Sequence, residues 1–119
     1  TPRNLVALIT SAPHDEKATV AFTIANGGMT SGLKVSVFLT ADAVNIVRKR
    51  AVDSVHSHPF SPLRELVADF QKRGGILWAC TPCVKARGYE QSDLIDGVVV
   101  AGASGMHELI QAGAATLSF

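Results

Sequence analysis

Residues 74–88, GGILWACTPCVKARG, hold both cysteines of the chain and the strongest indication of its architecture. The glycine pair ends a preceding helix, and residues 76–79 form a short apolar run typical of a buried strand that closes at Cys80. Residues 82–87 favour one or two helical turns, which Gly88 ends. The stretch therefore predicts a strand that leads directly into a short helix, with Cys80 and Cys83 at the junction.

Further apolar runs on both sides of this stretch predict four more strands. They occupy residues 5–10, 33–40, 97–101 and 114–119. The first run is continuous, as in strands that are buried on both faces. In the second, Val35, Val37 and Leu39 share one face.

Helical signals separate these strands. The clearest follows Ser61, the expected cap, and Pro62, the expected first helical residue, because apolar side chains then recur at helical spacing up to Gly74. A helix of small residues is expected after Ser11, its predicted cap, and is expected to end at the glycines of positions 27, 28 and 32. Weaker helical signals lie at residues 41–50, at residues 91–96 with Ser92 as the cap, and at residues 106–111, and residues 51–60 indicate a loop.

Strands that alternate with helices require right-handed crossovers and a mainly parallel sheet. The sequence therefore predicts an α/β three-layer sandwich with a five-stranded sheet of the flavodoxin-like type, formed by a single domain over residues 1–119. Functional groups in such sheets gather beyond the carboxyl ends of the strands, where Cys80 is expected to lie.

The composition describes a compact domain and argues against several classes of partner. Hydrophobic residues make up 47% and charged residues 18% of the chain, and the formal net charge is +1. We therefore expect no nucleic-acid partner, and no membrane partner, because no apolar run reaches the ~18 residues of a span. The N-terminus lacks a signal-peptide layout, so we expect a cytoplasmic location with reduced thiols. The basic runs at residues 48–50 and 72–73 are interpreted as solvated patches or as docking sites for an acidic partner.

The two cysteines are the candidate catalytic residues. A thiolate at a strand end is stabilised by the unpaired N–H groups and the dipole of the following helix, and Lys85 and Arg87 add positive charge nearby. We expect Cys80 to attack or receive a sulfur atom as the thiolate. Cys83 is expected to resolve the product as a disulfide or to relay the sulfur.

Other interpretations of these residues stay open at this point. The cysteines are also consistent with two small buried side chains, or with a zinc site completed by His56 and His58, although the spacing is not that of a zinc finger. For this reason we expect no metal. We also expect no cofactor, because residues 102–105 do not form a recognisable phosphate or dinucleotide loop. His14, His56 and His58 are either helpers of proton transfer or ordinary loop and helix-end residues.

Several features together point to a known family. They are the opening strand with its small-residue helix, the strand that ends at Cys80 with the basic segment up to Gly88, and the closing unit of residues 94–119. In order and spacing they resemble the DsrE/DsrF-like family. The resemblance implies a sulfur-relay or redox protein in which Cys80 carries sulfur as a persulfide, and assembly as trimers or hexamers. Pro82 and Cys83 stand where the relay branch has small apolar residues, which opens dithiol chemistry as well.

The sequence thus predicts a cytoplasmic sulfur-handling protein that works with a sulfur donor or acceptor protein. It is a persulfide carrier, a sulfurtransferase or a thiol-redox protein, and whether it turns over as an enzyme is left open. A second hypothesis is a small-molecule-binding or oligomeric assembly module without turnover. Its site would be the crevice at the strand ends or a subunit interface.

Overall fold

The computed structural model describes residues 2–119, in which five strands form one sheet. The strands are β1 (Asn4–Ile9), β2 (Lys34–Leu39), β3 (Ile76–Cys80), β4 (Val98–Ala101) and β5 (Ala115–Ser118). They lie in the order β4-β3-β2-β1-β5, and every neighbouring pair is parallel. The predicted α/β sandwich with a five-stranded parallel sheet is confirmed.

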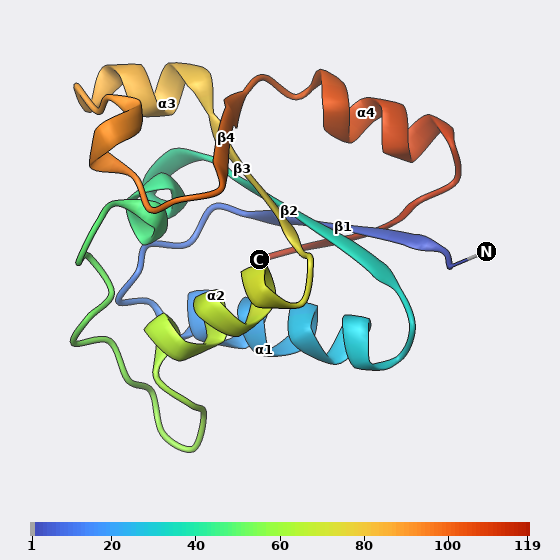
Figure 1. Cartoon of the computed structure of the whole chain (residues 1–119), viewed down its shortest axis with the longest axis horizontal. Coiled ribbons are helices and arrows are strands. Elements are labelled where there is room, and N and C mark those ends of the chain that lie inside the picture. Colours follow the sequence, from blue (N-terminus) through green and yellow to red (C-terminus); the bar gives the residue numbers. More distant parts are fainter. Residues whose placement is uncertain (1) are drawn as a thin grey trace.

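Helices cover both faces of the sheet, as Figure 1 shows. Helices α1 (Glu16–Thr30) and α2 (Leu63–Lys72) pack against each other on one face, and α4 (Ser104–Gln111) crosses the other. The chain first steps along the sheet from β1 to β2 and β3, whereas the last crossover returns from β4 to the opposite edge at β5. A right-handed crossover that reverses direction places its helix on the opposite face, so α4 lies across the sheet from α1 and α2.

Three short helical elements lie between the strands. The 3-10 segment η1 (Ala41–Val47) follows β2, and the short helix α3 (Thr81–Ala86) directly follows β3. A 3-10 turn, η2 (Gln91–Asp93), lies between α3 and β4. Of these elements, η1 and α3 build the surroundings of the two cysteines.

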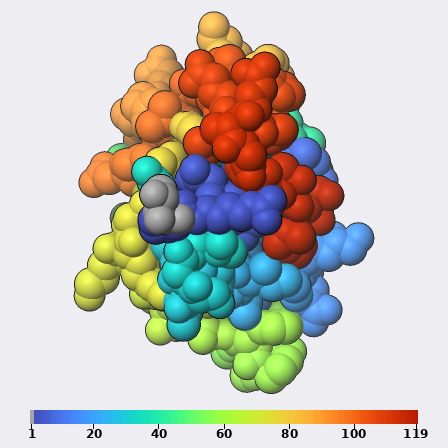
Figure 2. Space-filling view, turned by 90° about the vertical axis from the view of Figure 1, so that its right-hand side faces the viewer, coloured from blue at the N-terminus to red at the C-terminus, as the bar shows by residue number. Residues whose placement is uncertain are grey.

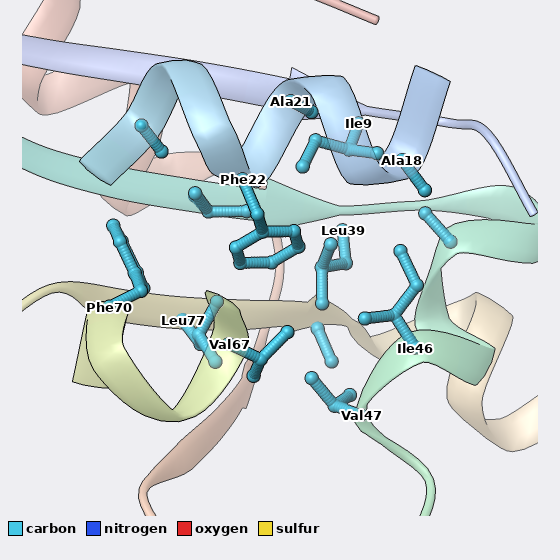
Figure 3. Close-up of a cluster of buried hydrophobic side chains, with 14 of the residues drawn as sticks. Ile9, Ala18, Ala21, Phe22, Leu39, Ile46, Val47, Val67, Phe70 and Leu77 are labelled. Atoms are coloured by element: carbon cyan, nitrogen blue, oxygen red, sulfur yellow. The ribbon is translucent and has the colours of Figure 1, made fainter. Parts of the chain in front are cut away.

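The main hydrophobic core lies between the sheet and the pair α1 and α2 (Figure 3). The Phe22 and Phe70 rings meet edge to face within it, with centroids 5.8 Å apart and an interplanar angle of 82°, a favoured aromatic geometry. A Cβ atom at Gly75 would overlap the Phe70 ring. Gly75 is therefore needed where the chain passes from α2 into β3.

The predicted N-cap of α1 is wrong, and its predicted C-terminal end is correct only in part. Asp15, not Ser11, is the N-cap, because its carboxylate accepts a hydrogen bond from the backbone N–H of Lys17. At the other end the helix continues through Gly27 and Gly28 to Thr30, and Gly32, with a φ of 94°, follows its end as predicted. A Cβ at Gly28 would lie 3.3 Å from side chains of β1 and β2. This glycine therefore allows close packing on the sheet and does not end the helix.

The predicted cap of α2 is also wrong. The helix begins at Leu63, and Pro62, not Ser61, takes the cap position without a side-chain hydrogen bond. The backbone N–H of Leu63 donates instead to the carbonyl of Val55, at 3.0 Å. A loop carbonyl thus satisfies the donor that Ser61 was expected to satisfy.

The weaker helical signals correspond to shorter elements. The signal at residues 41–50 becomes the 3-10 segment η1, and the signal at residues 91–96 becomes η2. The cap of η2 is Glu90, not Ser92, and Glu90 and Asp93 form a reciprocal capping box. Helix α4 begins at Ser104, two residues before the predicted start.

Candidate functional site

The two cysteines lie where the carboxyl ends of β2 and β3 meet. Leu39 and Ala79 are partners in the parallel register, so Thr40 and Cys80, which follow them, lie side by side at the carboxyl edge of the sheet. Cys80 occupies the cap position of α3, and Cys83 lies in the first turn of that helix. The structure thus confirms the predicted junction of strand and short helix.

Two hydrogen bonds reach Cys83 from the end of β2. The backbone N–H of Ala41 donates to the Cys83 Sγ at 3.2 Å, and the Thr40 Oγ1 lies 3.4 Å from the same sulfur. Both cysteines are half-buried, and no disulfide joins them. We call the group Thr40, Ala41, Cys80, Cys83 and Arg87 the thiol corner.

The thiol corner lowers the pKa of the Cys83 thiol. The hydrogen bond with the Thr40 hydroxyl has the largest effect, and partial burial opposes it. The Ala41 N–H, the Cys80 side chain and the positive charge of Arg87 lower the pKa further. A lowered pKa increases the thiolate fraction at neutral pH, and the thiolate is the nucleophilic form of cysteine.

The backbone at Ala41 is strained. Its φ of 53° is in the left-handed region, which costs a non-glycine residue about 1–2 kcal/mol. Thr40, immediately before it, is still extended, with φ −135° and ψ 166°. Strained residues of this kind cluster at functional sites, and here the strained residue supplies an N–H to the thiol.

Arg87 joins the two halves of the thiol corner. One guanidinium nitrogen donates to the backbone carbonyl of Cys83 at 3.1 Å, and another forms an ion pair with Asp42 at 2.7 Å. The side chain of Arg87 is 27% exposed, whereas that of Asp42 is 65% exposed. Arg87 therefore ties α3 to η1 and brings a partly neutralised positive charge to Cys83, as the sequence predicts for this residue.

The candidate histidines lie apart from the two cysteines. His14 is exposed in the turn before α1. His56 and His58 belong to the loop before α2, with ring centroids 4.1 Å apart, and the His56 Nε2 bonds to the Phe60 carbonyl at 2.9 Å. That loop is at the bottom of Figure 1, whereas α3 is at the top. Within residues 2–119, no hydrogen bond links a histidine to either cysteine.

The zinc alternative is wrong for the described part of the chain. Within residues 2–119, no three His, Cys, Asp or Glu side chains are grouped so that they can hold a metal ion. His56 and His58 contact each other and not Cys80 or Cys83.

The sequence interpretation missed the contributions of Thr40, Ala41 and Asp42. The available signal was the position of Thr40, the last residue of the strand predicted at residues 33–40. Carboxyl ends of neighbouring parallel strands share one crevice. To apply that rule, one must know that β2 and β3 are neighbours in the sheet. Hydrophobic periodicity alone does not predict the order of the strands.

The comparisons with known proteins agree with this architecture. The model of the DsrE/DsrF-like family matches residues 3–119. The chain belongs to the DsrE/DsrF-like family. This confirms the resemblance seen in the sequence and places both cysteines inside the matched region.

Two archaeal proteins that are similar in sequence to this chain carry the description "uncharacterized protein". The protein MJ0989 of Methanocaldococcus jannaschii is 32% identical over 104 residues, which cover 87% of this chain and 85% of that protein. The protein MK0008 of Methanopyrus kandleri is 32% identical over 108 residues, covering 89% and 83%. These relatives support the family and carry no further statement about activity.

Solved structures share the fold of this DsrE/DsrF-like chain. The crystal structure of the ychN protein from E. coli matches with a TM-score of 0.79 at 18% identity, over 100% of both chains. The protein of unknown function MTH1491 from Methanobacterium thermoautotrophicum matches with a TM-score of 0.75, also at 18% identity and over 100% of both chains. In residues 2–119, no helix has the length and apolar character needed to cross a membrane.

Proposed function

We propose that this DsrE/DsrF-like protein transfers sulfane sulfur, or exchanges thiols and disulfides, at Cys83 and Cys80. The observation that carries the proposal is the pair of contacts at the Cys83 Sγ, in which the Ala41 N–H donates and the Thr40 hydroxyl lies within hydrogen-bond distance. Family membership supports it, because the resemblance implies sulfur-relay or redox roles. The position of both thiols at the carboxyl ends of parallel strands is where such folds hold their reactive groups.

Cys83 is the attacking thiolate in this proposal, and Cys80 is the second thiol. This order reverses the one expected from the sequence, in which Cys80 attacks. The reason is that the Thr40 hydroxyl and the Ala41 N–H both lie at the Cys83 Sγ, where they can stabilise a thiolate, and that the Cys80 side chain also lowers the pKa of Cys83.

The proposed chemistry is a sequence of thiol exchanges. The Cys83 thiolate attacks the outer sulfur of a donor persulfide, the donor's S–S bond breaks, and the donor leaves as a thiolate. Cys83 then carries the persulfide. Attack by the Cys80 thiolate on the outer sulfur moves that sulfur to Cys80 for relay. Attack on the inner sulfur instead forms the Cys80–Cys83 disulfide and releases hydrosulfide.

Mass spectrometry after exposure to glutathione persulfide tests this order of events. We expect Cys80→Ser to gain one sulfur atom on Cys83 about as readily as the native protein, and Cys83→Ser to gain far less. Sulfur uptake by Cys83→Ser at the native rate, with loss of uptake in Cys80→Ser, would restore the order predicted from the sequence. Uptake by none of the proteins, with slow and equal alkylation of both cysteines, would favour the binding module without turnover.

We also infer that the protein forms a homo-oligomer, a trimer or a hexamer, and meets a sulfur donor or acceptor protein. The family resemblance implies this assembly, and the α4 side of the molecule offers apolar surface for it. No residue of α4 is buried. Val99, Ile110 and Leu117 are 40–50% exposed, and a cavity of about 260 Å³ separates α4 from β1 and β5. In Figure 2 the orange-red atoms of α4 and the red atoms of the C-terminal segment border the blue N-terminal strand.

Light scattering after size-exclusion chromatography tests the assembly. We expect a trimer or hexamer mass for the native protein and a smaller mass for Ile110→Asp, because a buried charge opposes association. Ile24→Asp is the matched control, since Ile24 on α1 is also 40% exposed. A native protein that is monomeric at micromolar concentration, or two variants that dissociate alike, would contradict the use of this face.

A further inference from the structure

A second cavity lies away from the thiol corner, between the end of η1, the loop that follows it, and α2. Its volume is about 230 Å³. Ile46, Val52 and Val67 form apolar walls, and the side chains of Arg48, Arg50 and Arg64 line it as well. Figure 3 shows Ile46 on η1 and Val67 on α2 among the side chains of the main core. Neither cysteine contributes to this cavity.

Positive charge exceeds negative charge around this cavity. Three arginines line it together with a single acidic residue, Asp53. The ion pair of Asp53 with Arg64 is long, at 3.9 Å, and both side chains are at least half exposed, so it holds Arg64 only weakly. Within residues 2–119, neither Arg48 nor Arg50 forms an ion pair. Three positive charges against one negative charge leave an excess of two.

The arginine donors remain accessible to a ligand. The Arg48 guanidinium lies 5.5 Å from the centre of the Tyr89 ring, a cation–π contact that orients the group and uses none of its N–H donors. A guanidinium presents a planar fork of donors that matches carboxylate or phosphate oxygens. The cavity thus combines apolar walls with cations suited to an oxyanion.

The walls of the cavity are held in place by the protein itself. Arg48 and Leu94 form an antiparallel bridge, in which Lys49 N–H donates to the Asp93 carbonyl at 2.9 Å and Ile95 N–H to the Val47 carbonyl at 2.9 Å. On the opposite side, Gln71 Nε2 donates to the Asp96 carbonyl at 2.8 Å. A preformed site loses less conformational entropy when it binds a ligand.

The backbone of Arg50 has an unfavourable conformation. Its φ of 68° lies in the left-handed region, which is uncommon for a residue with a long side chain. Arg50 lies two residues after the bridge residue Arg48 and lines the cavity. Strain that persists next to a cation-lined cavity is the pattern found at binding sites.

We propose that this cavity, the arginine pocket, binds a small amphipathic anion: a carboxylate or a phosphate monoester on an apolar group. At the ~30 Å³ that one water molecule occupies in the liquid, 230 Å³ corresponds to roughly eight non-hydrogen atoms, the size of a small aromatic acid. The apolar group lies against Ile46, Val52 and Val67, and the oxyanion meets Arg48 and Arg50. This inference does not depend on the chemistry proposed for the cysteines.

Titration with benzoate and with phenyl phosphate, followed by amide NMR, tests the arginine pocket. We expect saturable shifts at Ile46, Gln71 and Ile95 with at least one of the two probes, and which probe binds tighter separates carboxylate from phosphate recognition. Benzyl alcohol, which has the ring without the charge, is expected to bind far more weakly. Arg50→Gln should weaken binding about tenfold or more, as for the loss of charged hydrogen bonds. Lys17→Gln, a charge change on α1, should leave it unaltered.

Each remaining outcome overturns the proposal. No saturable shift with either probe up to about 10 mM, ten times the ~1 mM dissociation constant of a weak complex, shows that the cavity does not select this class of ligand. Equal binding of benzyl alcohol, or binding unaffected by Arg50→Gln, shows that the arginines do not recognise the anion. Equal binding of inorganic phosphate removes the role of the apolar walls. Binding only of an acidic peptide makes the region a protein-docking surface.

Discussion

The core beneath α1 and α2 and the thiol corner share the strands β2 and β3, yet they depend on different interactions. The core is held mainly by packing: Phe22, Phe70 and Leu77 fill the space between helices and sheet. The thiol corner is half-exposed and is held by a few directed contacts from Thr40, Ala41 and Arg87. A packing error in the core therefore lowers stability, whereas a polar deletion in the thiol corner alters reactivity and leaves the fold almost unchanged.

The largest expected effect on stability comes from Gly75→Ala, and Gly27→Ala is its control. The first substitution tests side-chain packing, and the second tests helix propensity. Gly75→Ala places a Cβ inside the Phe70 ring, and the displaced ring should cost about 1–3 kcal/mol. Gly27→Ala, in α1, meets no atom within 4 Å and should stabilise the helix by up to about 1 kcal/mol. Urea denaturation measures both, and alkylation of Cys83 below the transition should be the same in the two variants. Equal stabilities would contradict the account of Gly75.

Thr40→Val should change the reactivity of Cys83 and leave the stability of the protein almost unchanged. Thr40→Val removes the hydroxyl that most strongly lowers the pKa of Cys83, so alkylation of Cys83 at neutral pH should slow several-fold. The free energy of unfolding should change by no more than about 1 kcal/mol. Thr23→Val is the matched control, because Thr23 is also half-buried and its hydroxyl bonds a carbonyl within α1. An equal slowing in the control would remove the role of Thr40.

A smaller effect is expected from the ion pair of the thiol corner. Arg87→Gln removes a positive charge near Cys83 and should raise the pKa of its thiol slightly, because this charge affects the pKa less than the contacts with Thr40, Ala41 and Cys80. Asp42→Asn should have the opposite sign, since it leaves the Arg87 charge uncompensated. The pH dependence of alkylation compares the two variants, and shifts in the same direction would contradict this explanation. Both should cost less than about 1 kcal/mol of stability.

The smallest expected effect is a dependence of stability on pH. The folded state lowers the pKa of Cys83, so folding favours the thiolate. This contribution is fully present above the ordinary thiol pKa of ~8.5 and is lost as the pH falls through the lowered value of the folded protein. The free energy of unfolding should therefore rise with pH between those two values, and the rise should be absent in Cys83→Ser. An unchanged slope in the variant would attribute it to another group.

Much of the fold follows from the sequence because buried parallel strands leave strong local patterns. The apolar runs and the glycines around residues 74–88 sufficed for the strand, the short helix and the place of both cysteines. The cap of α2 could not be predicted from the sequence, because the Leu63 N–H bonds to the Val55 carbonyl and not to the side chain of Ser61. The partners of Cys83 did not follow either, since Ala41 is 42 residues away in the chain and meets the sulfur only once β2 and β3 are paired.

The most direct test of the central claim is the rate of iodoacetamide alkylation of each cysteine as a function of pH, in Cys80→Ser and in Cys83→Ser. The account predicts that Cys83, measured in Cys80→Ser, reaches its full rate at a pH clearly below that of a free thiol, and that it reacts faster than Cys80 at neutral pH. A Cys83 that reacts with the profile of a free thiol, while Cys80 is the faster of the two, would contradict the claim that the thiol corner activates Cys83.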